Sequence, residues 1–412
     1  MTAPNRVRSA AAATRGPVPG ATRRRPVRRG SAATGAAALG AALVAAIASP
    51  ALADTAQPAS GHFGYSGASD PAVFVQTDNT AGNEVVSYHR SPSGALTEVG
   101  SYDTGGLGGQ LTGSVVDHLA SQGSLALDRT AGLLIAVNAG SNTISVFGVS
   151  GDQLRRRQVI SSGGTFPVSV ATHGDQVYVL NAENGGAVQG YRIAFGRLVP
   201  MRGSNRTLGL DPAATPQFVN TPGQVAFSPD GSQLIVTTKS NGNDIDVFAV
   251  TRNGGLSSAP VVNSEPGTVP FGIAFDRAGN LVIAEAGTNA LTSFALNPSG
   301  TVTPIATAAT GQAATCWVAA AGRLLFAGNA GSASESILAD GPAGSLTEVG
   351  SPVSTDAGTV DSAASPDGQF LYVETGAAGI VDEFAVSPAG ALTKVGSVTV
   401  PGAVGGEGIA VG

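Results

Sequence analysis

The feature that most constrains the fold of this chain is a strand–turn–strand unit that recurs along it. The copy "TPGQVAFSPDGSQLIV" (residues 221–236) is followed by a loop rich in Asn and Gly, the alternating run "NDIDVFAV", and a further stretch. Apolar and polar residues that alternate between Gly, Pro and Asp predict half-buried strands joined by tight turns. Four strands in each repeat of roughly 43 to 57 residues, with no helical periodicity, are typical of β-propeller blades.

The two ends of the repeat array complement each other. The array starts with a second strand, "AVFVQTD", and stops at "GEGIAVG", which reads as a first strand with nothing after it. Pairing Gly408–Val411 with Val73–Thr77 closes the ring and removes two open sheet edges. We therefore predict an all-β fold, a single seven-bladed β-propeller closed by its C-terminal strand. The predicted blades are 71–104 with the C-terminal strand, 123–163, 166–202, 222–264, 270–310, 315–354 and 360–400.

The first 53 residues differ from the rest. They hold eight arginines and no acid, followed by an apolar run over 36–48 that is too short for a stable membrane anchor. With the small-residue site Ala51-Leu52-Ala53, they predict a signal peptide (1–53) cleaved after Ala53, a leader (54–65) and a propeller (66–412). We expect a secreted protein exported by the Sec route, with twin-arginine export at Arg28-Arg29 as the alternative.

Charge and cysteine content restrict the partners. Without residues 1–53 the chain has 14 basic and 28 acidic residues, a net charge near −14. Such a surface disfavours nucleic acid and anionic membranes. The one cysteine, Cys316, excludes an intrachain disulfide, and nothing basic beside it in sequence would lower its pKa. We expect a monomer with no cofactor and no bound metal, and no membrane insertion after signal cleavage.

Long irregular segments predict where a site lies. First-to-second and third-to-fourth strand connections are short turns on one face of a propeller, here the turn face. The other, the loop face, carries two insertions, residues 105–122 and 203–220. Function usually resides in such loops on a rigid scaffold. Register places a ring of residues at the channel mouth on this face: Ser124, Ser169, Gln224, Gly272, Trp317, Asp361 and Gly408, with Glu407 beside the last.

The chain resembles the lactonase-type seven-bladed β-propellers, which include bacterial 6-phosphogluconolactonases and fungal carboxymuconate cyclases. The stretches "PGQVAFSPDGSQLIV", "AGLLIAVNAGSNTISVFGV" and "GALTEVG" carry the resemblance over 66–412, although YVTN-type surface repeats share such blades. "SQGSLALD", "FPVSVATHGDQVYVLNAEN" and "TCWVAAAG" resemble a secreted actinobacterial-type subfamily.

The resemblance implies a Pro-Arg-His sequence before one inner strand and an Asn-Glu after the next strand. This chain has Pro222-Gly223-Gln224 and "VTTKSN" instead, with Asn181-Ala182-Glu183 one blade earlier. Gln224 can hydrogen-bond a ligand but cannot act as a general base.

Several other side chains are candidates for chemistry or binding. His118 with Asp117 forms a base if the carboxylate orients the imidazole, or else a solvated surface turn. Asp361 and Glu407 either polarise a water or cap strand ends. Trp317 either stacks on a ligand or packs between blades. Arg206, with Asp211, clamps an anion over the mouth or belongs to a plain loop. Ser124, Ser169 and Glu183 are further ligand-binding candidates.

These observations leave three functions open. The first is a secreted propeller that binds a small molecule, a glycan or an envelope protein at the loop face. The second is a lactonase or cycloisomerase acting on a sugar lactone or related organic acid, for which the missing histidine is unfavourable. The third is a structural cell-envelope repeat protein.

Overall fold

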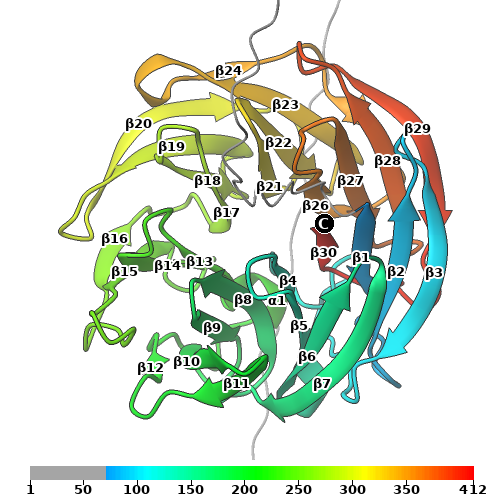
Figure 1. Ribbon diagram of the computed structural model, residues 1–412. Coiled ribbons are helices and arrows are strands. Elements are labelled where there is room, and N and C mark those ends of the chain that lie inside the picture. Colours follow the sequence, from blue (N-terminus) through cyan, green and yellow to red (C-terminus); the bar gives the residue numbers. More distant parts are fainter. Residues whose placement is uncertain (1–70) are drawn as a thin grey trace, which may run out of the picture. The chain divides into compact units, whose positions relative to one another are not determined.

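The computed structural model describes residues 71–412, which form seven antiparallel sheets around a central channel (Figure 1). The predicted signal peptide and leader, and residues 66–70 of the predicted propeller, lie outside the described residues. Blade 1 has the strand order β30-β1-β2-β3, and blades 2 to 7 follow in chain order. The predicted fold class is confirmed, and the seven predicted blade ranges contain the strands of the seven sheets, except that blade 3 also includes residues 206–207, which lie beyond its predicted range.

Seven short strands surround the channel and seven more lie directly outside them. The inner strands are β30 (Ile409–Val411), β4 (Leu125–Asp128), β8 (Pro167–His173), β13 (Pro222–Phe227), β17 (Pro270–Phe275), β21 (Thr315–Ala321) and β26 (Thr359–Ala364). The second strands are β1 (Ala72–Gln76), β5 (Leu133–Asn138), β9 (Gln176–Asn181), β14 (Gln233–Thr238), β18 (Leu281–Glu285), β22 (Leu324–Asn329) and β27 (Phe370–Thr375).

The outer half of each blade has the same plan. The third strands are β2 (Glu84–Arg90), β6 (Thr143–Ser150), β10 (Ala187–Ala194), β15 (Asp244–Ala249), β19 (Ala290–Leu296), β23 (Ser334–Asp340) and β28 (Ile380–Val386). The outermost strands are β3 (Leu96–Asp103), β7 (Gln153–Ser161), β11 (Arg197–Pro200), β16 (Val261–Ser264), β20 (Val302–Ala309), β24 (Leu346–Glu348) and β29 (Leu392–Thr399).

Short elements complete the fold. β12 (Arg206–Thr207) and β25 (Val353–Ser354) extend the outer edges of blades 3 and 6. The helical pieces are α1 (Gln217–Asn220) and the 3₁₀ turns η1 (Ala139–Ser141) and η2 (Pro342–Gly344). All three are too short to bury a face of their own, so the stability of the molecule resides in the sheets.

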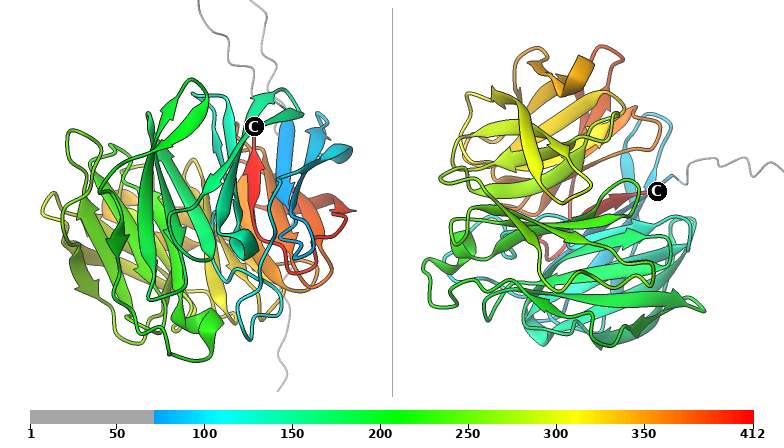
Figure 2. Two further views of the ribbon diagram at one scale, coloured as in Figure 1. Left: turned by 90° about the horizontal axis from the view of Figure 1, so that it is seen from below. Right: turned by 90° about the vertical axis from the view of Figure 1, so that its left-hand side faces the viewer.

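The ring closes as the chain ends predict. Val411, Ala410 and Ile409 of β30 pair with Val73, Phe74 and Val75 of β1 in antiparallel register. Figure 2 shows β30 in red beside β1 in blue, although they come from opposite ends of the described chain. Blade 1 is thereby a complete four-stranded sheet, and the edge of β1 that faces the channel is covered by β30.

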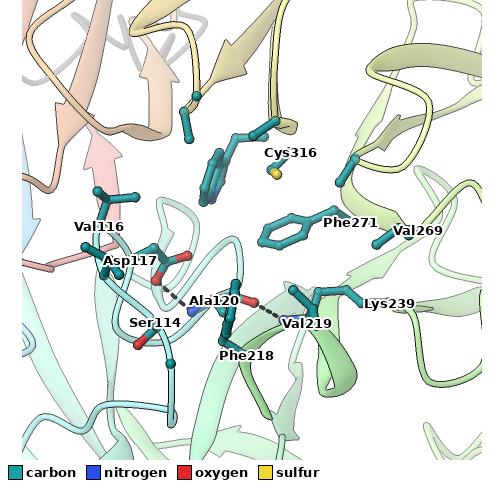
Figure 3. Close-up of a pocket in the computed structure, with 17 residues that line it drawn as sticks. Ser114, Val116, Asp117, Ala120, Phe218, Val219, Lys239, Val269, Phe271 and Cys316 are labelled. Atoms are coloured by element: carbon teal, nitrogen blue, oxygen red, sulfur yellow. Dashed lines mark hydrogen bonds between the residues drawn. The ribbon is translucent and has the colours of Figure 1, made fainter. Parts of the chain in front are cut away.

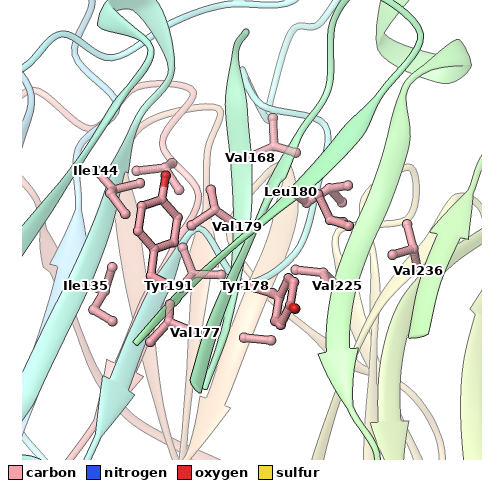
Figure 4. Close-up of a cluster of buried hydrophobic side chains, with 14 of the residues drawn as sticks. Ile135, Ile144, Val168, Val177, Tyr178, Val179, Leu180, Tyr191, Val225 and Val236 are labelled. Atoms are coloured by element: carbon pink, nitrogen blue, oxygen red, sulfur yellow. The ribbon is translucent and has the colours of Figure 1, made fainter. Parts of the chain in front are cut away.

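The core lies between blades. The second strands are buried along their whole length, because each faces a neighbouring blade on both sides, whereas outermost strands such as β7 alternate exposed and covered residues. Figure 4 shows two such interfaces, in which Ile135 and Ile144 of blade 2 and Val225 and Val236 of blade 4 flank the side chains of blade 3. The buried Tyr178 also donates from its hydroxyl to the carbonyl of Gly254 in blade 4 at 2.8 Å.

A β-bulge recurs where inner strands begin at the loop face. The pairing of inner and second strands shifts register at this point in five blades: at Pro167/Ser169, Pro222/Val225, Pro270/Ile273, Thr315/Trp317 and Thr359/Ser362. A bulge places extra residues on one strand and redirects their side chains. The predicted mouth positions Gln224, Gly272 and Asp361 are among these extra residues, and Trp317 borders one.

Candidate functional site

The first insertion, residues 105–122, crosses the loop face and is tied to distant parts of the ring. The backbone N–H of His118 donates to the carbonyl oxygen of Gly405 at 2.8 Å, shortly before β30. Gln122, in the same insertion, contacts Val318 of blade 6. Its Nε2 donates to the carbonyl of Val318 at 2.8 Å, and its Oε1 accepts from the N–H of Val318 at 3.0 Å. The insertion therefore partly covers the channel mouth.

The second insertion, residues 203–220, packs against the first. Gln217 of α1 accepts from the N–H of Thr112 at 2.9 Å and donates to Oε1 of Glu183 at 2.8 Å. The carbonyl of Val219 accepts from the N–H of Ser240 at 3.0 Å, which holds the end of α1 over blade 4. The two insertions thus meet above the inner strands of blades 4 to 6.

A cavity of about 390 Å³ lies beneath this meeting point (Figure 3). The first insertion supplies residues 113–117 and Ala120, α1 supplies Phe218 and Val219, and the rest of the wall comes from the loop-face ends of strands in blades 4, 5 and 6. At the rim Val115 is 76% exposed, whereas the side chains deeper in the wall are buried. The cavity is therefore open to solvent on the loop face, where the sequence predicts a site.

Two aromatic side chains form one wall of the cavity. The rings of Phe271 and Trp317 meet edge to face, with centroids 5.1 Å apart. The Trp317 side chain is only 3% exposed, and its indole Nε1 donates to the carbonyl of Ser121 at 2.7 Å. Trp317 therefore packs between the first insertion and blade 5, and it presents an aromatic surface to the cavity. Its stacking on a ligand stays a prediction.

Of the residues that the structure describes, Lys239 is the one basic side chain in the cavity wall. It directly follows β14, is 1% exposed, and donates from Nζ to the carbonyl of Ala120 (Figure 3). Nζ also lies 5.1 Å from the centre of the Phe271 ring. Burial among apolar groups lowers the pKa of Lys239 to about 7, although the nearby Asp117 and Cys316 act in the opposite direction. The amine is therefore substantially neutral at neutral pH.

Asp117 holds the turn that carries the partner of Lys239. One carboxylate oxygen accepts from the N–H groups of Leu119 and Ala120 at 2.8 and 2.7 Å, and the other accepts from the N–H of Ser121 at 2.9 Å. Burial raises the pKa of Asp117 to about 7 despite these bonds. Asp117 and Lys239 thus interact through the backbone of Ala120 and through space, and no direct ion pair joins them within residues 71–412.

The predicted His118–Asp117 pair is not brought together. The carboxylate of Asp117 bonds only backbone N–H groups, while Nδ1 of His118 is buried without a hydrogen-bond partner in residues 71–412. The segment is a turn in which Asp117 is buried and His118 half-buried, so it is not a solvated helix either. Burial lowers the pKa of His118, which keeps the imidazole neutral.

The polar residues of the predicted mouth ring bond the protein itself. Ser124 Oγ donates to the carbonyl of Glu407 at 2.5 Å, and Ser169 Oγ donates to the carbonyl of Gln122 at 2.7 Å. Oε1 of Gln224 accepts from the N–H of Ile273 at 2.5 Å and so connects blades 4 and 5. These residues lie below the first insertion and none of the three lines the apolar cavity.

Asp361 and Glu407 belong to a cluster of buried acids beside the channel. Oε1 of Glu407 accepts from the N–H of Gly123 at 2.7 Å, and its carboxyl hydrogen-bonds that of Asp361. Burial raises the pKa of Asp361 to about 6. Burial also raises the pKa of Glu407 well above its usual range, and repulsion from nearby acids raises it further; these acids are Asp361, Asp117, Asp78 and Glu374. Burial and repulsion from these acids therefore favour the protonated form of Glu407.

The remaining predicted residues lie away from the cavity. Arg206 donates from Nε to the carbonyl of Ser257 at 2.7 Å and from Nη2 to that of Leu256 at 2.8 Å, which fastens the second insertion to blade 4. Glu183 contacts Gln217 in a separate small pocket under the second insertion. Both residues support the insertions, and neither lines the cavity.

Sequence reasoning missed Lys239 and Phe271 as site residues. Lys239 stands in "VTTKSN", the stretch that occupies the family's Asn-Glu position, and it is one of two lysines in the chain. A lysine at the loop-face end of a fully buried strand was the available signal. The sequence around Phe271 contains no comparable signal, because its ring faces Lys239 through the bulge in β17.

Two further findings concern the described part of the chain. Within residues 71–412 no three His, Cys, Asp or Glu side chains are arranged to hold a metal ion. No helix in that same range is long and apolar enough to cross a membrane.

Solved structures share this fold at low sequence identity. A Bacteroides fragilis protein described as a candidate 6-phosphogluconolactonase superposes with a TM-score of 0.63 at 18% identity, over 84% of this chain and 99% of that chain. The periplasmic gluconolactonase of Pseudomonas aeruginosa superposes with a TM-score of 0.65 at 19% identity, over 83% of this chain and 99% of that chain. A Lactobacillus plantarum protein gives 0.65 at 20% identity, over 82% and 98%.

No family model and no curated protein matches the sequence. The resemblance to lactonase-type propellers is therefore confirmed at the level of the fold, and the chemistry has to be argued from the site.

Proposed function

We propose that this chain is a secreted β-propeller that binds an apolar small molecule in the cavity between its two insertions. The observation that carries the proposal is the cavity itself: about 390 Å³ of space with apolar and aromatic walls and one buried amine. Concave, mostly apolar sites with few polar groups are the usual form of small-molecule sites. The secreted location rests on residues 1–53, whose composition is that of a signal peptide.

The cavity wall favours an apolar ligand over a sugar phosphate or a glycan. Among residues 71–412, Lys239 and Asp117 are the only ones in this wall that can carry a full charge near neutral pH, and the hydrogen-bonding groups of Asp117 are already used by backbone N–H groups. A polyhydroxylated ligand would lose its bonds to water and gain few in return, which costs about 1–3 kcal/mol for each group left unpaired. An apolar body with one polar group fits this inventory.

Hydrolysis of an apolar lactone is a second candidate function. The specific observation in its favour is Lys239, an amine that faces the cavity and whose lowered pKa of about 7 leaves part of it neutral at neutral pH, so that it can serve as a base or nucleophile. It would replace the histidine whose position is taken by Gln224. The Pseudomonas aeruginosa gluconolactonase has the same fold, but a gluconolactone is more polar than this cavity favours.

Trp317 makes binding directly measurable, because it is the only tryptophan in the chain and lines the cavity. We expect its fluorescence to change saturably when residues 54–412 are titrated with 2-heptanol, 2-heptanone or γ-nonalactone, and to be unchanged by glucono-δ-lactone. Ala330→Leu, which fills the cavity wall, should weaken the response. Ala389→Leu, at an exposed turn-face position, is the matched control. No saturable response to any apolar compound would refute the proposal.

Turnover separates the two candidates. Each lactone is followed by NMR with correction for spontaneous hydrolysis, in wild type and in Lys239→Met, His118→Ala and an Asp361→Ala/Glu407→Ala double variant. Turnover lost in Lys239→Met but retained in His118→Ala identifies an enzyme with Lys239 as its base. Saturable binding without turnover identifies a binding protein.

A further inference from the structure

We propose that Lys239 is a nucleophilic amine that captures apolar aldehydes or ketones as a Schiff base inside the cavity. The inference deepens the proposed function and rests on it, because the carbonyl compound has to enter the same cavity. It names a ligand class that neither the fold nor its solved neighbours indicate.

The position of Lys239 at the protein–cavity boundary supports this role. Its side chain is almost wholly buried, yet it contributes to the cavity surface beside Phe271 and Phe218. The carbonyl of Ala120 is the one hydrogen-bond acceptor that the described residues offer Nζ. That single bond orients the amine and leaves its other positions free of protein acceptors. A desolvated lysine in an apolar pocket is an established way to obtain a nucleophilic amine.

The reaction balances without any further reagent. The Nζ lone pair attacks the carbonyl carbon, a carbon–nitrogen bond forms, and a proton moves from nitrogen to oxygen to give a carbinolamine. Loss of one water molecule then gives the imine. Once protonated, the imine carries a positive charge about where the ammonium group lay, 5.1 Å from the centre of the Phe271 ring, which stabilises a cation through its π face.

The titratable groups facing the amine are Asp117 in the first insertion and Cys316 in β21. Burial raises the pKa of the Cys316 thiol to about 12, so at neutral pH it adds no charge and does not compete as a thiolate. Asp117 keeps its oxygens on the turn N–H groups, which leaves the amine free to react rather than locked in a direct ion pair.

The chain supplies its own control, because Lys394 is the only other lysine. Lys394 is 40% exposed and paired with Asp356 and Asp382, and these carboxylates raise its pKa. We expect heptanal with sodium cyanoborohydride at pH 7 to alkylate Lys239 at least about tenfold faster than Lys394, since far less of Lys394 is neutral. Peptide mapping of the folded wild-type protein gives both rates, and in urea the two lysines should react alike.

Competition distinguishes cavity capture from general amine reactivity. 2-Heptanol has no carbonyl group, so it should slow labelling of Lys239 without affecting Lys394. The variant Lys394→Met should retain labelling at Lys239, and Lys239→Met should lose it.

The two proposals fail separately. If Trp317 responds to 2-heptanol but Lys239 is labelled no faster than Lys394, the Schiff-base inference is wrong while the binding proposal stands. If Trp317 does not respond and Lys239 is not labelled preferentially, both are wrong. Preferential labelling that 2-heptanol does not slow would also overturn the inference, because capture would then occur outside the cavity.

Discussion

At the scale of single residues, Lys239 is costly to the fold, and that cost is measurable. Between about pH 7 and the ordinary lysine pKa, Lys239 is protonated in the unfolded chain but largely neutral in the folded protein. The folded state therefore binds fewer protons in this range, and Lys239 destabilises the protein most at its lower end. Lys239→Met removes the titration and keeps the apolar length of the side chain. We expect the variant to gain stability over wild type at pH 7, and the gain to shrink by on the order of 2 kcal/mol at about pH 9.5.

Urea unfolding of both proteins at the two pH values checks this prediction. Lys239 also lowers the pKa values of its neighbours Asp117 and Cys316, so the difference between the two proteins reports Lys239 together with its effect on these two groups. The exposed Lys394→Met is the matched control and should show no such gain. An equal stability difference at both pH values would contradict a depressed lysine pKa.

Residue roles were the hardest feature to predict from the sequence. The repeat register predicts Gln224 and Ser169 at the channel mouth, and their hydrogen bonds are made to a neighbouring blade and to the first insertion. The sequence gives positions along strands but not the bulges that redirect side chains. For the same reason the approach of Lys239 to the turn at Asp117, more than a hundred residues away, could not be predicted.

At the scale of elements, the first insertion depends on Gln122. This buried side chain makes two hydrogen bonds to the backbone of Val318 in β21 of blade 6. Gln122→Ala leaves a buried N–H and a buried carbonyl without partners. We expect a loss of about 1–3 kcal/mol in unfolding free energy and faster amide hydrogen exchange over 105–122 and at Val318.

Gln110→Ala is the matched control in the same insertion. Its amide donates to the carbonyl of Ser114 from an exposed position, where water can replace it. We expect this variant to lose less than about 0.5 kcal/mol of unfolding free energy. Equal exchange profiles in the two variants would show that Gln122 does not hold the insertion in place.

The closing strand β30 gives a second prediction at this scale. Ile409 is buried against blade 1, and its pairing with Val75 helps to close the ring. Ile409→Ala should lower unfolding free energy by about 2–5 kcal/mol and increase aggregation, because weakening β30 exposes the edge of β1. Val404→Ala, at a residue that is already exposed, should change little. Equal thermal melting of both variants would argue against β30 as the strand that closes the ring.

At the scale of the whole molecule, buried carboxyl groups determine the pH dependence of stability. Burial raises the pKa of Asp78 to about 8, and burial with mutual repulsion raises those of Glu374 and Glu407 well above their usual range. The folded state therefore binds more protons than the unfolded chain above about pH 4. Stability is highest on the acid side of this window and falls as the pH rises through the folded pKa values.

Thermal melting at pH 5 and pH 8 checks the sign, and we expect the higher melting temperature at pH 5. Glu407→Gln keeps the hydrogen-bonding shape but removes the titration, so the difference should decrease. Asp230→Asn is the surface control. Hydrogen bonds in its exposed turn lower the pKa of Asp230, so this substitution should change the pH dependence of stability only at acid pH. A wild type more stable at pH 8 would show that these acids are ionised in the folded protein.

The architecture was predictable because every blade repeats the same physical pattern. Gly-, Pro- and Asp-rich turns between alternating strands recur often enough to define blade boundaries, and the incomplete repeats at the two ends determined the closure. The insertions do not repeat, and the path of residues 105–122 depends on single contacts such as that of Gln122 with Val318. The cavity, which the insertions enclose, was therefore outside the reach of the repeat pattern.

The affinity of a homologous series of γ-lactones, from γ-hexalactone upward, tests the central claim most directly. Calorimetric titration of residues 54–412 should give affinities that rise about fourfold with each added methylene, close to 0.8 kcal/mol, until the cavity is full. In Ala330→Leu the affinity should stop rising at a lactone with a shorter alkyl chain, and Ala389→Leu should behave like wild type. Affinities independent of chain length, or glucono-δ-lactone binding more tightly than γ-nonalactone, would contradict an apolar small-molecule site.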